Sequence, residues 1–592
     1  MNIRGLVRLH SRTRKTRDRY ASFVNSNRPV PCIRRTLSLG IGSLVFAFGV
    51  SGSVEPIAER LGCGSVSHAV FAQAQEQKGL PFLDEATDKQ LSAESIGDME
   101  KVVGLCEKAL REGLDDENKK FARQLAASTL LKISEQRASK IAEQQRDKRW
   151  QGIRDLAVKD LEKARSFDDN NANVHMMRAR LLALPGGNRN EALASADRAI
   201  KLFADDKREL VRALLLRSGL RTDPQEQIAD LNAAVDLEQE GNTAREARAL
   251  LYLSRGDGEN ASKDFAELAD RDPNNPQTRF AYAMALVAIK KFPEALEQAT
   301  KIIEANPRLT GPYKLRAQVK RALNQTKEAI ADLDTAIQLE PQDLEAMLLR
   351  ADVYEDLKDF DRARADVEQV LQARPGLPAA ILQRAQLYSL QKRYDLAIAD
   401  LGQLLQQDPK NVQLRVQIAQ LYLAGGWPRK AIEYTSAILQ DVPDNWIAHR
   451  GRGDAYLAIG KHAEAIADFE TAVKLAPDHS GILNNFAWVL ATTPDDKLRS
   501  ADRAIEFATR ACEITKYEES HILSTLAAAY AEKGDFETAI KWSTKAVELG
   551  TEEQKEPLRK ELESYQQKKA WRESQSTEEK PNPPELPGTS KS

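Results

Sequence analysis

Small residues and prolines recur with one fixed period over a large part of the chain. Prolines are spaced by 34 residues without interruption, at positions 273, 307, 341, 375, 409, 443 and 477. When each unit is numbered from the third residue after a proline, position 8 is always small: Ala283, Ala317, Ala351, Ala385, Ala419, Gly453 and Ala487. Position 20 is alanine at Ala295, Ala329, Ala363, Ala397, Ala431 and Ala465. A period of this length indicates that the chain stacks one structural unit many times.

The pattern inside each unit predicts two packed helices. Two helices approach closely only where small side chains meet, so positions 8 and 20 mark their contact. Larger apolar residues beside that contact, such as Tyr354 at position 11 and Leu333 at position 24, fill the remaining space. The proline ends the second helix, because it cannot continue a helix and disfavours helical geometry in the residue before it. We therefore expect one antiparallel helix pair in each unit.

Small residues at positions 8 and 20 and proline at position 32 resemble the tetratricopeptide repeat (TPR) family. The resemblance covers about residues 97–550 and includes looser units on both sides of the regular ones. It implies an all-α fold, a right-handed superhelical solenoid of antiparallel helix pairs with about 11–12 repeats. It also implies a partner, since the family binds protein or peptide segments in the concave groove of the superhelix.

Departures from the repeat pattern divide the chain into segments. We expect a basic N-terminus with a signal peptide or membrane anchor at 1–74, a linker at 75–96, degenerate TPR-like repeats at 97–241, regular repeats at 242–478, C-terminal repeats with an insertion at 479–550, a polar capping helix at 551–573, and a disordered tail at 574–592. A solenoid needs a polar cap at its open end, and a polar, proline-rich tail is typical of disorder.

The N-terminus differs from the rest of the chain in charge. Residues 1–35 hold nine arginines and Lys15 against Asp18, a net +9, which leaves −11 for residues 36–592 of the total −2. The apolar run at 36–50 that follows is typical of a secretory signal peptide. We expect an exported protein, periplasmic or extracellular, or one anchored to the membrane by this segment if it is uncleaved; an organelle transit peptide is the alternative. The acidic body argues against nucleic-acid binding.

The sequence contains no motif that indicates catalysis, a cofactor or a metal. Its seven histidines form no HExxH motif, and no glycine pair is followed by the lysine and serine or threonine of a phosphate-binding loop. Cys106 and Cys512 are far apart in the sequence and resemble small buried apolar residues. We expect a chain that is not an enzyme, with no cofactor and no metal ligands.

The family resemblance assigns the concave groove to positions 2, 5, 9, 12 and 13 of each first helix. The groove candidates at these positions fall into two groups. The first is Lys314, Gln318, Arg321, Asp352, Glu355 and Asp356, and the second is Arg450, Asp454, Asn484 and Trp488. A tryptophan framed by an arginine and polar groups is typical of an interface hot spot.

Each group has an alternative interpretation. The charges of the first can pair with one another and with Glu345 across the groove, contributing little at an exposed surface. Trp488 can pack between repeats, because its unit carries an insertion near 493–497. For function, the first hypothesis is a protein-binding scaffold. The second is a substrate-recognition or regulatory subunit of an enzyme such as a glycosyltransferase, with catalysis supplied by the partner.

Overall fold

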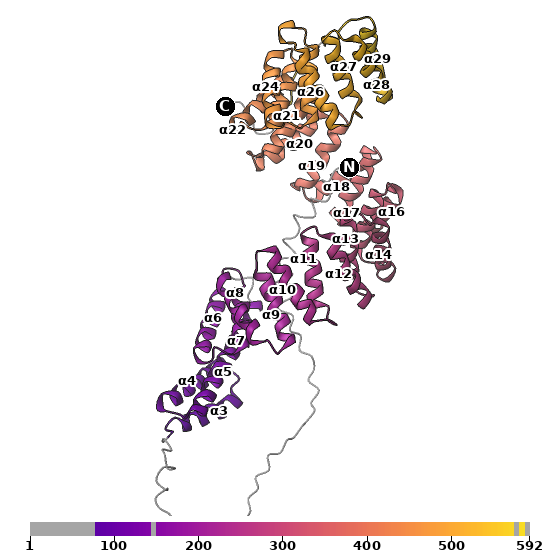
Figure 1. Ribbon diagram of the computed structural model, residues 1–592. Helices are drawn as coiled ribbons and strands as arrows, with labels where there is room; N and C mark the ends of the chain where they lie inside the picture. Colours follow the sequence, from indigo (N-terminus) through magenta and orange to yellow (C-terminus); the bar gives the residue numbers. More distant parts are fainter. Residues whose placement is uncertain (1–76, 144–149, 574–578, 587–592) are drawn as a thin grey trace, which may run out of the picture. The chain divides into compact units, whose positions relative to one another are not determined.

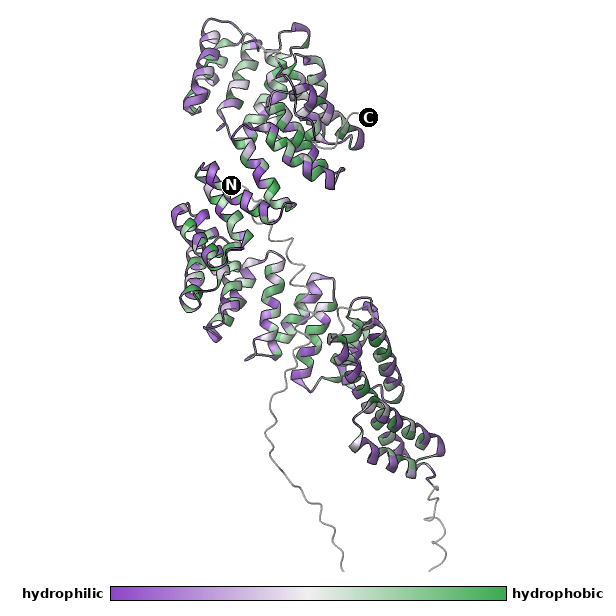
Figure 2. Cartoon of the chain, turned by 180° about the vertical axis from the view of Figure 1, so that it is seen from behind, coloured by the Kyte–Doolittle hydropathy of each residue, from purple (hydrophilic) through white to green (hydrophobic). Residues whose placement is uncertain are grey.

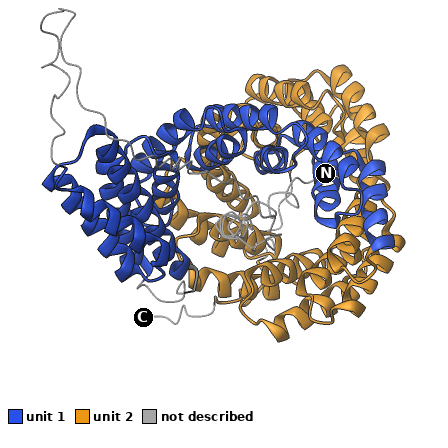
Figure 3. Cartoon of the chain, turned by 90° about the horizontal axis from the view of Figure 1, so that it is seen from below, with its two compact units in different colours: residues 1–305 blue, residues 306–592 orange. Residues whose placement is uncertain are grey.

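A computed structural model describes residues 77–143, 150–573 and 579–586, and the expected signal or anchor at 1–74 lies outside them. In the described residues all regular structure is helical (Figure 1). The chain divides into two compact units, residues 1–305 and 306–592, coloured separately in Figure 3. The helices of the first unit are α3 (Leu80–Ser92), α4 (Ile96–Glu112), α5 (Asp116–Glu143), α6 (Trp150–Phe167), α7 (Ala172–Leu182), α8 (Arg189–Leu202), α9 (Lys207–Leu220), α10 (Pro224–Leu237), α11 (Thr243–Ser254), α12 (Gly258–Arg271), α13 (Pro276–Ala288) and α14 (Phe292–Ala305).

The second unit continues the same series of helix pairs. Its helices are α15 (Thr310–Ala322), α16 (Thr326–Leu339), α17 (Leu344–Asp356), α18 (Phe360–Ala373), α19 (Pro378–Leu390), α20 (Tyr394–Gln407), α21 (Val412–Ala424), α22 (Pro428–Asp441), α23 (Trp446–Ala458), α24 (His462–Leu475), α25 (Ser480–Thr492), the short 3₁₀ helix η2 (Asp496–Leu498), α26 (Ala501–Ile514), α27 (Ser520–Glu532), α28 (Phe536–Leu549) and α29 (Glu552–Gln566). The expected all-α solenoid of helix pairs is confirmed, and among the described residues the pairs run from α3/α4 to α27/α28.

The contact between the two helices of a pair is made by the predicted small residues. Ala351 and Ala363 of α17/α18 are 0% exposed, and the matching alanines of the other regular pairs are buried in the same way. Large apolar residues beside them, such as Val367, are also fully buried. Figure 2 shows hydrophobic (green) and hydrophilic (purple) residues alternating along individual helices. The repeat is thus held by apolar burial at fixed positions.

The turn inside each pair from α11/α12 to α23/α24 has a constant backbone geometry. The residue at position 15 takes a positive φ, as at Lys358 (58°) and Lys392 (58°), and at Gly426 (84°) and Gly460 (76°). The next residue donates its N–H to the carbonyl at position 11, for example Asp359 to Tyr354 at 2.9 Å. This left-handed residue closes the first helix and satisfies carbonyls that would otherwise lack donors.

An ion pair at two fixed positions also links the two helices in five pairs, and we call it the arginine–aspartate device. An arginine at position 7 donates two hydrogen bonds of 2.6–2.9 Å to a buried aspartate at position 23 of the same pair. The pairs are Arg248–Asp264, Arg316–Asp332, Arg350–Asp366, Arg384–Asp400 and Arg452–Asp468. Bidentate geometry fixes the angle and the register of the two helices as well as neutralising the buried charge.

Two of the expected segments differ in structure from what the sequence predicted. Residues 75–96 are not simply a linker, because α3 forms there and buries Leu83 and Ala86 in apolar clusters shared with residues of α4. The tail at 574–592 is not disordered throughout, because residues 579–586 lie against the turn between α21 and α22, where Leu586 is only 7% exposed. Both segments are polar in overall composition, but each contains a few apolar residues that are buried against neighbouring helices.

Candidate peptide-binding site

The second group of groove candidates borders a cavity in the C-terminal repeats of the second unit. The cavity lies between α25, α27 and α29, and Leu457 of α23 completes its wall. Asn484 and Trp488 of α25 line it, as the repeat register predicts. Ser520, His521, Ser524 and Thr525 come from α27, and Glu553, Gln554, Pro557, Leu558 and Glu561 come from α29. We call this space the C-terminal cavity.

Asn484 is the cavity residue whose polar atoms are least satisfied. The residue is 9% exposed, and its side-chain carbonyl oxygen has no hydrogen-bond partner among the described residues. Its amide nitrogen donates one long bond, 3.3 Å, to Asn485. Leaving a buried carbonyl oxygen unpaired costs about 1–3 kcal/mol, and in a native structure such a group calls for an explanation.

The other two members of this group lie beside the cavity and are held by neighbours. Asp454 accepts a hydrogen bond of 2.8 Å from Asn485, and Arg450 approaches it at 3.6 Å along α23. Burial raises the pKa of Asp454 above its ordinary value, while Arg450 and Asn485 act in the opposite direction. Trp488 is half-buried against the apolar cluster of these repeats, and it also lines the cavity.

A buried carboxylate closes the far side of the cavity. Glu561 of α29 is 8% exposed, and the hydroxyl of Ser524 donates a hydrogen bond to it. Burial raises the pKa of Glu561 to about 7, and the hydrogen bond from Ser524 opposes this shift. Glu561 could not be predicted from the sequence, because it stands in a polar helix outside the repeat register. Ser524 and His521 could have been found by extending positions 2 and 5 into the last repeat.

The first group of candidates is occupied by its own ion pairs. Lys314 of α15 contacts Asp343 at 2.7 Å and Glu345 at 3.0 Å. Arg321 contacts Asp352 at 3.2 Å and also forms an ion pair with Asp356 of α17. This is the pairing between consecutive first helices that the sequence left open as an alternative.

The acidic members of this first group also accept hydrogen bonds from the next repeat. Gln383 of α19 donates to Asp352 at 2.7 Å, and Gln386 donates to Glu355 at 2.5 Å. Burial raises the pKa of Glu355 above its ordinary value. Gln318 lies half-buried on α15 between Lys314 and Arg321. We call this set the ion-paired cluster.

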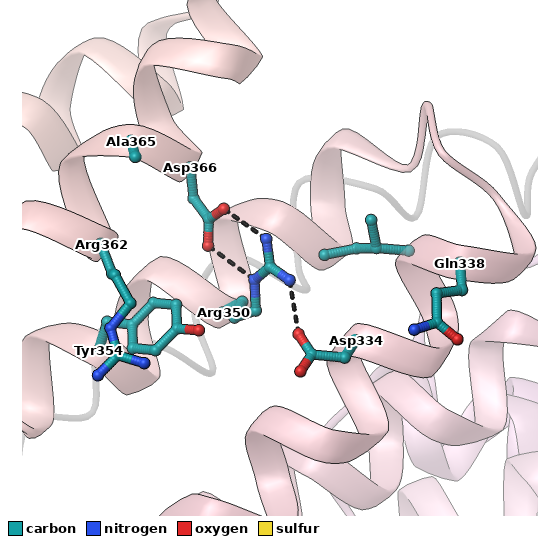
Figure 4. Close-up of a pocket in the computed structure, with 8 residues that line it drawn as sticks. Asp334, Gln338, Arg350, Tyr354, Arg362, Ala365 and Asp366 are labelled. Atoms are coloured by element: carbon teal, nitrogen blue, oxygen red, sulfur yellow. Dashed lines mark hydrogen bonds and ion pairs between the residues drawn. The ribbon is translucent and has the colours of Figure 1, made fainter.

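A second depression lies over the arginine–aspartate device of α16, α17 and α18 (Figure 4). Arg350 donates to Asp366 at 2.6 and 2.9 Å and to Asp334 at 2.5 Å, so one guanidinium joins its own pair to the preceding one. The hydrogen bonds that Arg350 donates to these two carboxylates raise its pKa, although burial opposes the shift. Arg362 stacks on Tyr354 at 4.7 Å beside them. Three donors of Arg350 are engaged internally, so the depression serves packing and is not the better binding site.

The fold is that of an all-α helical-repeat solenoid, and sequence models agree. Models of the tetratricopeptide repeat match residues 246–309, 314–378, 379–411, 416–480 and 520–549. Together with the helix pairs, these matches show that the chain belongs to the tetratricopeptide repeat family, and they support a protein-interaction scaffold. No curated protein shows significant sequence similarity to the chain.

Several solved structures are similar to parts of the chain. A tetratricopeptide repeat protein from Parabacteroides merdae is 19% identical, with a TM-score of 0.34, and the match covers 42% of this chain and 98% of that one. Yeast Tom70 is 14% identical, with a TM-score of 0.36, over 82% and 95%. A TPR protein of Thermus thermophilus is 23% identical, with a TM-score of 0.27, over 31% and 100%. No functional conclusion rests on these similarities.

Across residues 77–143, 150–573 and 579–586, no helix combines the length and the apolar character needed to cross a bilayer. In the same part of the chain, no cluster of three or more histidine, cysteine or acidic side chains could hold a metal ion.

Proposed function

We propose that the chain is a non-catalytic scaffold that binds an extended segment of a partner polypeptide in the C-terminal cavity. The observation that carries the proposal is the buried, unpaired carbonyl oxygen of Asn484, a residue that lines that cavity. A backbone N–H of a bound segment is a donor of the right kind and size for it. Binding would therefore remove an existing penalty as well as add a contact.

The rest of the cavity suits an extended segment. Trp488 offers a large, half-buried apolar surface, and tryptophan is enriched among residues that dominate binding energies. Ser520, Thr525 and Gln554 line the same cavity and carry polar groups that can bond peptide N–H and C=O groups. His521, half-exposed at 55%, lies where a segment enters. The acidic net charge of the body disfavours nucleic acid as the partner.

Site-specific photocrosslinking of the full chain tests this proposal. A benzophenone amino acid replaces His521 at the cavity or, as the matched control, the exposed Lys541 on α28. We expect a partner in a cell-envelope extract to crosslink from position 521 but not from 541, and the crosslink to disappear when Trp488→Ala is added. Equal crosslinking from both positions, or a crosslink that survives Trp488→Ala, would rule out the cavity.

The identity of the crosslinked partner separates the two hypotheses for function. A catalytic protein, such as a glycosyltransferase, would make the chain a substrate-recognition or regulatory subunit. A structural or transported protein would make it a general scaffold. Circular dichroism of each variant confirms that the helices have formed.

Export to the periplasm or the extracellular space, or anchoring to the membrane by the N-terminal segment, is a separate proposal. It rests on the basic residues at 1–35 and the apolar run at 36–50. A fusion of residues 1–80 to a reporter that is active only outside the cytoplasm tests it. We expect activity with the native segment and its loss when charged residues interrupt the apolar run. A reporter that stays inactive with the native segment would contradict export.

A further inference from the structure

The C-terminal segment 579–586 lies against the turn between α21 and α22, although 150 residues or more separate the contacting positions. The N–H of Lys580 donates to the carbonyl of Gly426 at 3.0 Å. The hydroxyl of Tyr422 donates to the carbonyl of Pro584 at 2.7 Å. These two bonds hold the backbone of the segment at two points, and they do not depend on its side chains.

Charged and apolar side chains hold the two ends of the same segment. At one end, Arg429 donates from its guanidinium to Glu579 at 2.8 Å and from its backbone N–H to the same carboxylate at 3.3 Å. At the other end, Leu586 is 7% exposed and belongs to the buried apolar cluster that contains Tyr422 and Trp427. The segment thus has an acidic anchor, a backbone-bonded middle and a leucine anchor.

The middle of the segment is rich in proline, which suits an aromatic surface. Pro581, Pro583 and Pro584 carry no N–H, so only their carbonyls need partners, and the chain changes direction at Asn582, where φ is 57°. Proline-rich segments lose little conformational entropy on binding and dock on aromatic-lined grooves. Here the aromatic residues are Tyr422 and Trp427, packed edge to face at 6.3 Å.

The repeat of α21/α22 differs from its neighbours at the positions that form this surface. The repeats on both sides have the arginine–aspartate pair at positions 7 and 23, as Arg384–Asp400 and Arg452–Asp468. In α21/α22 these positions are Ile418 and Tyr434, and the ring of Tyr434 lies 5.3 Å from that of Tyr422. An apolar, aromatic surface replaces an ion pair in this repeat alone of the three.

Position 16 of the α21/α22 repeat also differs from position 16 of the two flanking repeats. In the flanking repeats a basic residue at this position covers the ring of the position-11 tyrosine: Arg393 lies 5.3 Å from the Tyr388 ring and Lys461 lies 5.7 Å from the Tyr456 ring. In α21/α22 the residue is Trp427, and Lys580 of the C-terminal segment lies 5.9 Å from its ring. The segment therefore supplies a cation where the repeat itself lacks one.

Trp427 also retains an unused donor. It is 8% exposed, and its indole N–H has no hydrogen-bond partner within the described part of the chain. The C-terminal segment leaves this donor unsatisfied, so it is an incomplete match to the surface. A segment of the same kind that offers a carbonyl to the indole would bind more tightly.

We propose that Tyr422, Gly426, Trp427 and Arg429 form a second peptide-binding site, the tail site. Its ligand class is a proline-rich segment that turns between its prolines, with an acidic residue before them and a leucine after them. The chain's own residues 579–586 are its resident ligand and hold the site closed until a partner segment of the same class displaces them. The tail site is separate from the C-terminal cavity and does not depend on it.

Competition between the resident segment and a free peptide tests the proposal in the full chain. The probe is a fluorescent peptide with the sequence of residues 576–588, measured by anisotropy. In Leu586→Asp the resident segment loses its apolar anchor and the site opens. Because a tethered ligand acts at an effective concentration of about millimolar, we expect the probe to bind Leu586→Asp at least about tenfold more tightly than the wild type.

Variants of the surface itself locate the site. In the Leu586→Asp background, Arg429→Ala should weaken probe binding by up to about fivefold, because it removes an ion pair whose arginine is 74% exposed. Tyr422→Phe removes one hydrogen bond and should weaken it about fivefold. Lys430→Ala is the matched control, since Lys430 pairs only with Glu433 among the contacts of the described chain, and it should leave binding unchanged.

Hydrogen exchange gives a second measurement that does not depend on probe affinity. The amide of Lys580 should be protected in the wild type and exposed in Leu586→Asp, with the exchange of α21 and α22 otherwise retained. Equal probe binding by the wild type and Leu586→Asp, no binding to either at millimolar probe, or an unprotected Lys580 amide in the wild type would each overturn the proposal. Loss of binding with Lys430→Ala equal to that with Arg429→Ala would overturn the location.

Discussion

The ion-paired cluster and the C-terminal cavity occupy equivalent positions on the first helices of their repeats, yet they differ in how their polar atoms are satisfied. In the cluster, Lys314 and Arg321 each contact two carboxylates of the next repeat. In the cavity, Asn484 keeps a buried carbonyl oxygen without a partner. The same register can therefore yield a surface that is complete in itself or one that lacks a partner, and the second is the better candidate for binding.

We expect the largest change in the free energy of unfolding at Arg350, whose guanidinium is paired with two carboxylates. Arg350→Met removes the guanidinium that neutralises the buried Asp366 and contacts Asp334. Leaving such a charge unpaired should lower the free energy of unfolding by about 3 kcal/mol. Urea denaturation followed by circular dichroism measures it. The double variant Arg350→Met with Asp366→Leu should recover most of the loss, and a double variant as unstable as the single one would contradict a charge-based cause.

A pH-dependent effect is expected at the cavity. The pKa of Glu561 is raised from 4.5 to about 7 in the folded chain, so the folded state binds more protons than the unfolded state between these values. Its carboxylate therefore costs stability as pH rises from about 4.5 to 7, and the cost stays constant above that range. Glu561→Gln should match the wild type near pH 5 and exceed it by roughly 1–2 kcal/mol at pH 8. A difference that does not change between pH 5 and pH 8 would show that burial does not control this carboxyl.

At Asn484 we expect smaller changes, in which the free energy of unfolding rises and the affinity for the partner falls. Asn484→Leu removes the unpaired buried oxygen while keeping a similar volume, so the free chain should gain about 0.5–1 kcal/mol in unfolding free energy. The same change removes the acceptor that a bound segment uses, so partner affinity should fall about fivefold. Thermal denaturation and a binding titration measure the two. A variant that is both less stable and unchanged in binding would make Asn484 an ordinary structural residue.

The smallest effect is expected in the ion-paired cluster. Arg321→Ala breaks pairs that are about one-third exposed, so it should lower the unfolding free energy by no more than about 1 kcal/mol. Because these pairs satisfy one another, partner binding at the cavity should not change. The result is checked by the same urea titration at low and at high salt. A loss that is unaffected by salt would argue against an electrostatic origin.

Sequence alone could predict the fold because its determinants recur. Small residues at positions 8 and 20 act only through the partner helix next in sequence, so the contact between Ala351 and Ala363 follows from spacing. The same register selects Asn484 and Trp488 as candidates, and both residues line the C-terminal cavity. Whether Arg321 forms ion pairs within the chain or binds a partner depends on distances between repeats, which the spacing of residues in the sequence does not give.

Two of the features that the sequence did not predict, Glu561 and the segment 579–586, lie outside the repeat register. Glu561 stands in a polar helix whose buried side is visible only after α29 has packed. The arginine–aspartate device was not predicted, because a charged residue at position 7 is expected to be exposed until its buried partner at position 23 is known. The segment 579–586 has the composition of a disordered chain, and only the aromatic surface at Tyr422 and Trp427 explains why it is held.

Partner affinity in two matched variants tests the central claim most directly. The partner obtained by crosslinking is titrated against the full-length wild type, Trp488→Ala and Arg321→Ala, each with its folded content checked by circular dichroism. We predict a loss of at least about 30-fold for Trp488→Ala, in the range of an interface hot spot, and no loss for Arg321→Ala. Unchanged affinity for Trp488→Ala, or a loss at Arg321→Ala as large as the one at Trp488→Ala, would contradict the assignment of binding to the C-terminal cavity.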